Sequence, residues 1–288
     1  MNFPAFEVQL KADRSRIERL AEEVLSLPDP LHEAMKYALK GGKMLRGFLV
    51  LESARLHEVP EDVAQYAALA IECIHAYSLI HDDLPCMDND DLRRGQPTVH
   101  RKWDEATAVL AGDALQTLGF ELLANDVLGE ARLPLIHTLA LAAGREGMVA
   151  GQMLDIIAET ATTPLSLGQI TRLQAGKTGA LLLWSAVAGA QMAGAETAAL
   201  ENYGRQIGLA FQIADDILDV EGDAGTVGKA TRKDENAGKA TFVSLLGMDE
   251  AKRRANVLVQ EACQALSIYG ASGEALRQAA RFVIARQK

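Results

Sequence analysis

The residues best suited to chemistry are two clusters of aspartates, each embedded in an apolar, helix-forming pattern. The first cluster lies in the segment HDDLPCMDNDDLRRG and the second in FQIADDILDV. Their acidic members of interest are, in chain order, Asp82, Asp83, Asp88, Asp215, Asp216 and Asp219. In the second cluster, Asp215 and Asp219 are one helical turn apart and share a face, while Asp216 lies about 100° round the same turn. Both clusters therefore concentrate negative charge on a short stretch of helix.

Such a concentration of carboxylates needs a counterion, because neither cluster has a basic residue at helical spacing. A hard cation with oxygen ligands fits, and Mg²⁺ suits best because it binds one or two carboxylates together with substrate phosphates. A lone Asp-Asp pair is more often a solvated helix end. Two such clusters inside apolar helices favour a metal site that joins protein carboxylates to a phosphorylated substrate.

A phosphorylated substrate also needs direct cationic ligands, since a carboxylate cannot bind a diphosphate without a metal between them. Arginine binds phosphate oxygens in a bidentate manner and lysine supplies a compact charge. Candidates at helix ends and in loops are Lys43 and Arg46, Arg93 and Arg94, Lys177 with Thr178, Lys229 and Lys239. His75 precedes Asp82 by two helical turns on nearly the same face. Singly, each has an ordinary surface or core explanation; together, beside the acidic clusters, they indicate a diphosphate site.

Composition narrows the class of protein. Apolar residues make up 49% of the 288 residues, which indicates a globular chain. The net charge of −10 argues against nucleic acid as a partner. Three widely spaced cysteines, Cys73, Cys86 and Cys263, form no zinc pattern and suit reduced thiols. With no signal-peptide pattern at the N-terminus, we expect a cytoplasmic protein.

Apolar periodicity predicts helices nearly throughout and no convincing strand. We expect helices over residues 6–26, 31–39, 44–57, 60–83, 104–124, 134–157, 166–194, 197–220, 249–269 and 274–286. The glycine-rich, charged segment 221–240 predicts a loop. The segments 63–80 and 180–195 are apolar nearly all round, which is typical of the central helices of a bundle. The uncharged stretch between Lys177 and Glu196 is long enough to span a membrane, but its Thr, Ser, Gln and Gly residues favour a buried core helix.

At this point the chain resembles a known family, the trans-type polyprenyl diphosphate synthases of class I isoprenoid chemistry. The first aspartate cluster, followed by Arg93-Arg94-Gly95, is similar to the longer form of the first aspartate-rich motif, and DDILD is similar to the second. The segments GGKMLRG, IHAYSLIHDD, GKTGALL and GKATRKDENAGKATF also resemble family segments in the right order. Asn89 replaces an Asp common in the bacterial enzymes, which affects only the subfamily assignment.

The resemblance implies an all-α fold: one domain over residues 1–288, a large helical bundle around a deep central cavity, usually as a homodimer. It implies that Mg²⁺ is bound by Asp82 and Asp88 on one wall, with Asp83 in support. On the other wall the ligand is Asp215, with Asp216 and Asp219 behind it. The ligands implied for the allylic diphosphate are Arg93, Lys177, Thr178, Gln212 and Lys229, with Lys239 nearby. Those implied for isopentenyl diphosphate, the homoallylic substrate, are Lys43, Arg46, His75 and Arg94.

The expected reaction is ionisation, condensation and elimination, with Asp82, Asp88, Arg93, Lys177 and Asp215 as the catalytic set. Metal and cationic side chains stabilise the departing diphosphate. The allylic cation is then attacked by the double bond of isopentenyl diphosphate, and the released diphosphate accepts the proton. An apolar cavity keeps water from the cation. The segment from Gly176 to Gly179 is expected to kink its helix and to turn carbonyl oxygens toward the cation.

Product length is expected to depend on Tyr77, just before Ser78, where bacterial farnesyl synthases carry Tyr-Ser and similar plant geranylgeranyl enzymes carry Met-Ser. The helical wheel places Tyr77 about 140° from Asp82, so only the resemblance places it in the cavity. We therefore expect a farnesyl diphosphate synthase. The alternatives are a geranylgeranyl diphosphate synthase, a terpene cyclase, which would leave Lys43, Arg46 and Arg94 idle, and a non-catalytic partner subunit of the same fold.

Overall fold

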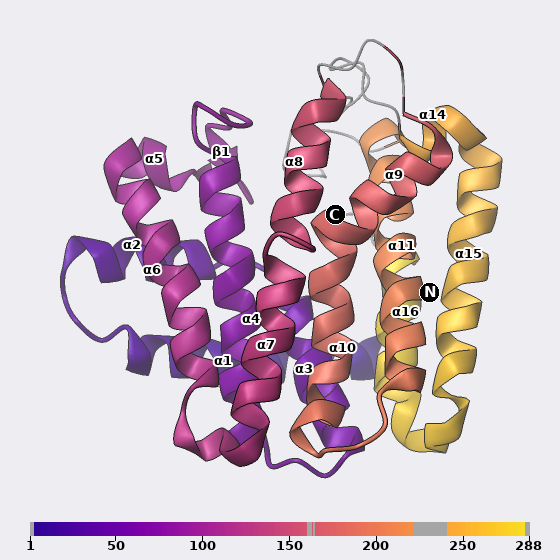
Figure 1. The fold of residues 1–288 in the computed structure, drawn as a ribbon, viewed down its shortest axis with the longest axis horizontal. Coiled ribbons are helices and arrows are strands. Elements are labelled where there is room, and N and C mark those ends of the chain that lie inside the picture. The colour runs from indigo at the N-terminus through magenta and orange to yellow at the C-terminus, as the bar shows by residue number, and fades with distance from the viewer. Residues whose placement is uncertain (1–2, 160–162, 164, 222–240, 286–288) are drawn as a thin grey trace.

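The computed structural model describes residues 3–159, 163, 165–221 and 241–285, and these form a bundle of long helices (Figure 1). The longer helices are α1 (Pro4–Val24), α2 (Pro30–Leu39), α3 (Leu45–Leu56), α4 (Glu61–Asp82), α6 (Glu105–Leu123), α7 (Arg132–Ala143), α8 (Met148–Glu159), α9 (Leu167–Gln174), α10 (Ala180–Met192), α11 (Ala198–Glu221), α15 (Met248–Ala265) and α16 (Glu274–Ala285). Shorter elements are α5 (Val99–Lys102), α14 (Phe242–Leu246), the 3₁₀ helices η1 (Asp126–Ala131) and η3 (Leu266–Gly273), and the π-helical turn η2 (Ala175–Gly179). The predicted all-α fold class is confirmed.

The core consists of two clusters of buried apolar side chains that meet at α3 and α10. One cluster joins these helices to α4, α6 and α7, and the other joins them to α11, α15 and α16. Figure 1 shows the same division, with α4 and α6 on one side, α11, α15 and α16 on the other, and α8 and α10 between them. As expected from its all-round apolarity, α10 is central, and nine of its residues are buried.

The longest of the apolar helices, α4, is also long and apolar enough to cross a membrane. In the fold, 67% of its most apolar window is buried inside the protein. The side chains that pack against it come from α3 and α6, so α4 occupies the position of a core helix.

Several helix boundaries follow from local chemistry. The Asp29 carboxylate caps α2 by accepting from the Leu31 and His32 backbone N–H groups, at 2.9 and 3.0 Å. Ser166 and Gln169 form a capping box that opens α9. These side chains satisfy backbone donors that the first helical turn leaves without partners.

Two predicted helices are interrupted in the structure. The segment 134–157 is divided into α7 and α8 at Gly144 and Gly147, where a β-carbon on Gly147 would lie 1.9 Å from the Ala142 carbonyl oxygen. The segment 166–194 is divided by the π-helical turn η2, which contains the predicted kink from Gly176 to Gly179. Both interruptions depend on backbone approach rather than on apolar periodicity, so the periodicity did not reveal them.

The expectation of no strand is wrong at one point. Residues Leu92–Arg93 (β1) and Gln96–Pro97 (β2) form a two-stranded antiparallel hairpin. Its turn places Arg94 and Gly95 at positive φ, 54° and 75°, and the Tyr37 hydroxyl anchors it by donating to the Pro97 carbonyl at 2.7 Å. Strands of two residues carry no detectable alternation. The hairpin matters because it presents Arg93 and Arg94.

Candidate active site

The first aspartate cluster occupies the end of α4 and the turn that follows it. The Asp88 backbone N–H donates to the Asp82 carbonyl at 2.8 Å, so the chain folds back after Pro85, as the proline predicts. Burial raises the pKa of the Asp82 carboxyl to about 6; Lys177 lowers it and the neighbouring Asp88 raises it again. Burial is thus the main obstacle to ionising this carboxyl, and the positive charge of Lys177 offsets it only in part.

The two carboxylates of the Asp82-Asp83 pair have different surroundings. Asp83 is only 3% exposed and forms an ion pair with Arg93, whose Nε lies 2.9 and 3.0 Å from the two carboxylate oxygens. Asp82 instead lines a cavity beside Lys177. Asp83 therefore supports the site by holding the hairpin arginine.

The second cluster lies on α11, and its two adjacent aspartates also have different surroundings. Asp216 is 4% exposed. One of its oxygens accepts from Gln212 Nε2 at 3.0 Å, and the other accepts from the Phe242 backbone N–H at 2.7 Å. Asp219 is also buried, whereas Asp215 is more accessible. Asp215 is thus the most accessible of the three carboxylates in this cluster.

The turn η2 links the two acidic clusters. Lys177 is electrostatically close to Asp82, and its ammonium group donates to Asp155 at 2.7 Å. The next residue, Thr178, donates its hydroxyl to Gln212 Oε1 at 3.3 Å, one turn before Asp215. Lys177, Thr178 and Gln212, three of the residues expected to hold the allylic diphosphate, therefore form a connection between α4 and α11.

An apolar cavity of about 320 Å³ opens beside Asp82, Lys177 and Thr178. Its walls include Tyr77 and Ser78 from α4, and four apolar side chains of α8, namely Met148, Val149, Met153 and Ile156. Tyr77, which the helical wheel left turned away from Asp82, does line this cavity and is only 5% exposed. The cavity can hold a hydrocarbon chain whose charged end remains with the aspartates.

A second pocket of about 230 Å³ adjoins the first and collects a separate set of cations. It is lined by Lys43, Arg46, His75 and Arg94, which are the four residues implied for isopentenyl diphosphate. Arg46 and His75 line both pockets, so the pockets meet there. Burial, with the guanidinium groups of Arg46 and Arg94 next in effect, holds the pKa of His75 well below its ordinary value. A neutral His75 can donate one hydrogen bond to an anionic ligand.

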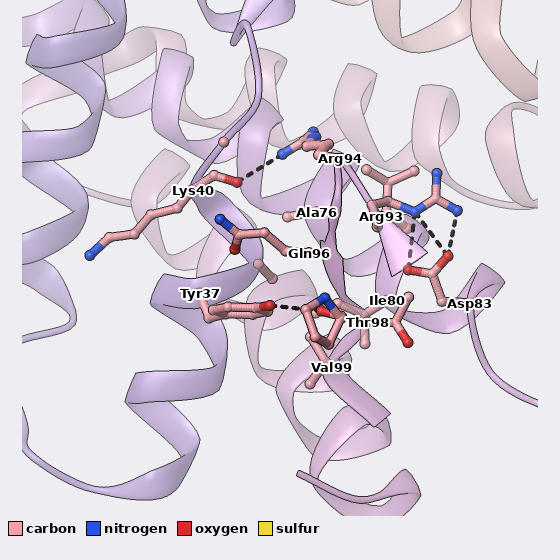
Figure 2. A pocket seen from close by; sticks show the side chains of 14 residues that line it. Tyr37, Lys40, Ala76, Ile80, Asp83, Arg93, Arg94, Gln96, Thr98 and Val99 are labelled. Atoms are coloured by element: carbon pink, nitrogen blue, oxygen red, sulfur yellow. Dashed lines mark hydrogen bonds and ion pairs between the residues drawn. The ribbon is translucent and has the colours of Figure 1, made fainter. Parts of the chain in front are cut away.

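Arg93 and Arg94 point into a small third pocket between α2, α4 and the hairpin (Figure 2). Figure 2 shows Arg93 against Asp83, and Arg94 donating to the Lys40 carbonyl, at 3.1 Å. A β-carbon on Gly42 would lie 2.8 Å from the Arg94 guanidinium group. The second glycine of the GGK segment therefore makes room for a residue of the neighbouring pocket.

Two site residues were missed by the sequence analysis. Glu72 is buried in the second pocket and accepts from the Gly47 backbone N–H at 2.8 Å. Asp155, also buried, accepts from Lys177. Each is an isolated acid in an apolar stretch of helix, which is the signal that could have identified it. Two expected ligands, Lys229 and Lys239, lie outside the described residues.

Comparison with known proteins identifies the family. The pattern of the family "Polyprenyl synthetase" matches residues 28–271. The chain belongs to this family. The "Farnesyl diphosphate synthase" of Escherichia coli is 42% identical to this chain, and the match covers 100% of both chains. A crystal structure of an "FPP/GFPP synthase" from Zymomonas mobilis is 46% identical, with a TM-score of 0.88 over 97% of this chain and 99% of that one. A geranyltransferase from Helicobacter pylori, solved in complex with magnesium and isoprenyl diphosphate, is 36% identical, with a TM-score of 0.80 over 99% and 98% of the two chains.

The raised pKa of Asp82 predicts that Asp82→Asn stabilises the fold at neutral pH. The native carboxyl has a pKa of about 6 against an ordinary 3.8, so the folded chain binds this proton more tightly than the unfolded chain. The carboxylate therefore destabilises the fold above pH 6, and the penalty disappears as the pH falls toward 4. Thermal unfolding should show a higher midpoint for the variant at pH 7.5 and equal midpoints near pH 4. Asp113→Asn, a change at an exposed position of α6, is the control. An equal rise of its unfolding midpoint at pH 7.5 would refute the explanation.

Proposed function

We propose that this chain condenses isopentenyl diphosphate with dimethylallyl and geranyl diphosphates to give farnesyl diphosphate. The observation that carries the proposal is the junction of two pockets at Arg46 and His75. One pocket is cationic, and the other is an apolar cavity with Asp82, Lys177 and Thr178 in its wall. The relative from Escherichia coli, which matches over its whole length, carries the name of this activity. A terpene cyclase has no use for the second cationic pocket.

The carboxylates fit a magnesium cofactor held jointly with substrate. Asp82 and Asp88 on one side, and Asp215 on the other, would hold the ions. Among the described residues, no three His, Cys, Asp or Glu side chains converge to form a closed metal site. This suits Mg²⁺, whose shell is completed by phosphate oxygens and water. When bound, the metal supplies positive charge that stabilises the diphosphate leaving group.

The side chains around the first pocket would hold and activate the allylic diphosphate. Lys177, Thr178 and Gln212 already form a connected series beside Asp82, and Arg93 is oriented by Asp83. As the bond between carbon and oxygen breaks, its electron pair leaves with the diphosphate, and these donors stabilise the growing charge. The apolar walls of the cavity keep water from the allylic cation that remains.

The second pocket would bring the homoallylic double bond to that cation. Lys43, Arg46 and Arg94 bind the diphosphate of isopentenyl diphosphate, and neutral His75 donates a hydrogen bond. The double bond then forms the new carbon–carbon bond, and the proton lost from the adjacent carbon passes to the released diphosphate. Because both substrates are held at a common junction, the reaction becomes effectively unimolecular.

We further propose that the chain forms a homodimer through the outer faces of α6, α7 and α8. These helices carry exposed large apolar side chains at Val109, Leu110, Leu133, Leu141, Leu154 and Ile157. A concentration of exposed apolar side chains is typical of a surface that is covered in the assembled protein. A cytoplasmic location remains our expectation from the cysteines.

A direct test is to incubate the purified chain with dimethylallyl and isopentenyl diphosphates and to size the product chromatographically. Farnesyl diphosphate should form with Mg²⁺ and not after chelation. Asp215→Asn should lower turnover by at least about 100-fold, as expected for loss of a group that stabilises transition-state charge. The helical circular dichroism should be unchanged. Metal-independent turnover, or a variant within a few-fold of the parent, would contradict the assignment.

The neighbouring arginines should affect different substrates. Arg94 lines the second pocket and Arg93 does not. Arg94→Ala should therefore raise the KM for isopentenyl diphosphate about 10- to 100-fold, since a hydrogen bond to a charged group contributes about 1.5–3 kcal/mol. Arg93→Ala should chiefly affect the allylic substrate. Arg101→Ala, at an exposed ion pair, is the control. If replacing Arg93 and replacing Arg94 change the KM values for both substrates equally, the two sites are not distinct.

Product length should change when Tyr77 is replaced. Tyr77 is a buried wall of the apolar cavity, so Tyr77→Met should deepen the cavity and allow one further five-carbon unit. Tyr66→Met is a matched control, because Tyr66 lies on the same helix but contacts the core instead. Both products are sized by chromatography after dephosphorylation. An active Tyr77 variant with unchanged product would remove the main structural support for the fifteen-carbon assignment.

A further inference from the structure

Helices α4 and α6 approach each other through glycines on α6. Gly112 faces His81 and Gly119 faces Ile74, so the two helices run antiparallel with their side chains in register. A β-carbon on Gly112 would lie 2.1 Å from His81 Nε2, far inside van der Waals contact. The imidazole therefore occupies the space that any other residue at position 112 would fill.

The His81 side chain in turn contacts Tyr77. Its ring packs edge to face against the Tyr77 ring, with centroids 5.8 Å apart and planes at 73°. Its Nε2 lies 3.2 Å from the Val109 carbonyl of α6. Both Tyr77 and His81 line the apolar cavity. His81 therefore lies between Gly112 of α6 and the cavity, beside Tyr77.

We propose that Gly112 is a specificity-determining residue that sets product length by giving the His81 imidazole room beside α6. The inference rests on the proposed function and deepens it. With glycine, the imidazole lies against α6 and leaves the cavity deep enough for a farnesyl chain. A larger residue at position 112 pushes the imidazole toward the Tyr77 ring and into the cavity.

The direction of this displacement follows from what surrounds the imidazole. On one side stands the backbone of α6, which cannot yield without breaking helical hydrogen bonds. On the other side are the edge of an aromatic ring and the open volume of the cavity. An added methyl group therefore moves the imidazole, and the cavity loses volume beside Tyr77, the wall expected to limit chain length.

The α4–α6 contact also provides a matched control. A β-carbon on Gly119 would lie 3.0 Å from Ile74 Cδ1 and 3.2 Å from the Ala70 carbonyl oxygen. Ile74 does not line the cavity. Gly119→Ala thus overpacks the same helix pair, two turns away, without moving a cavity wall.

The test is the ratio of geranyl to farnesyl diphosphate formed under Mg²⁺ by each variant, with thermal stability measured in parallel. Gly112→Ala should raise this ratio about tenfold, because a misfitted methyl group in a packed site changes a rate by roughly that factor. Gly119→Ala should leave the ratio unchanged at comparable stability. Combining Gly112→Ala with His81→Ala should restore the farnesyl product.

His81→Ala alone keeps the proposal testable if Gly112→Ala fails to fold. Removing the imidazole should let the Tyr77 ring yield and give products longer than those of the parent. The proposal is overturned if active Gly112→Ala keeps the parental ratio, if Gly119→Ala shifts it equally, or if His81→Ala leaves product length unchanged. A parent protein that makes no farnesyl diphosphate would instead refute the proposed function.

Discussion

The site depends on the close approach of three backbones at the π-helical turn η2. A β-carbon on Gly151 of α8 would lie 2.1 Å from the Lys177 backbone nitrogen, and one on Gly208 of α11 would lie 3.0 Å from the Gly179 α-carbon. Only glycine allows helices on both sides to touch the turn. This contact places Lys177 beside Asp82 and Thr178 beside Gln212. A substrate site between α4 and α11 follows from that packing.

The two pairs of adjacent aspartates share one geometric arrangement. In each pair, rotation by about 100° along the helix separates a more accessible carboxylate from a buried one that ties the structure together. Asp83 holds the hairpin through Arg93, and Asp216 holds the start of α14 through the Phe242 N–H. The accessible carboxylate belongs to the proposed metal site, while its neighbour fixes the position of the elements around it.

The sequence was sufficient for the all-α fold and for most helix boundaries, because apolar periodicity and capping residues are local signals. It also indicated a set of candidate site residues, since motifs such as GGKMLRG and DDILD keep their order along the chain. It indicated a kink from Gly176 to Gly179, but it could not show that a π-helical turn forms there, because that depends on glycine contacts between distant segments. Glu72 and Asp155 were overlooked for a similar reason, as their partners, Gly47 and Lys177, are distant in sequence.

Both ends of the described chain meet at the wall of the cationic pocket. The Phe282 side chain of α16 lines that pocket, with Lys43 Nζ 5.0 Å from its ring centroid. Phe3 and Phe6 of the first helical segment pack against the same ring, at centroid distances of 6.3 and 5.0 Å. Contacts this distant in sequence form late in folding. A nascent chain on the ribosome therefore cannot complete this pocket until α16 has emerged.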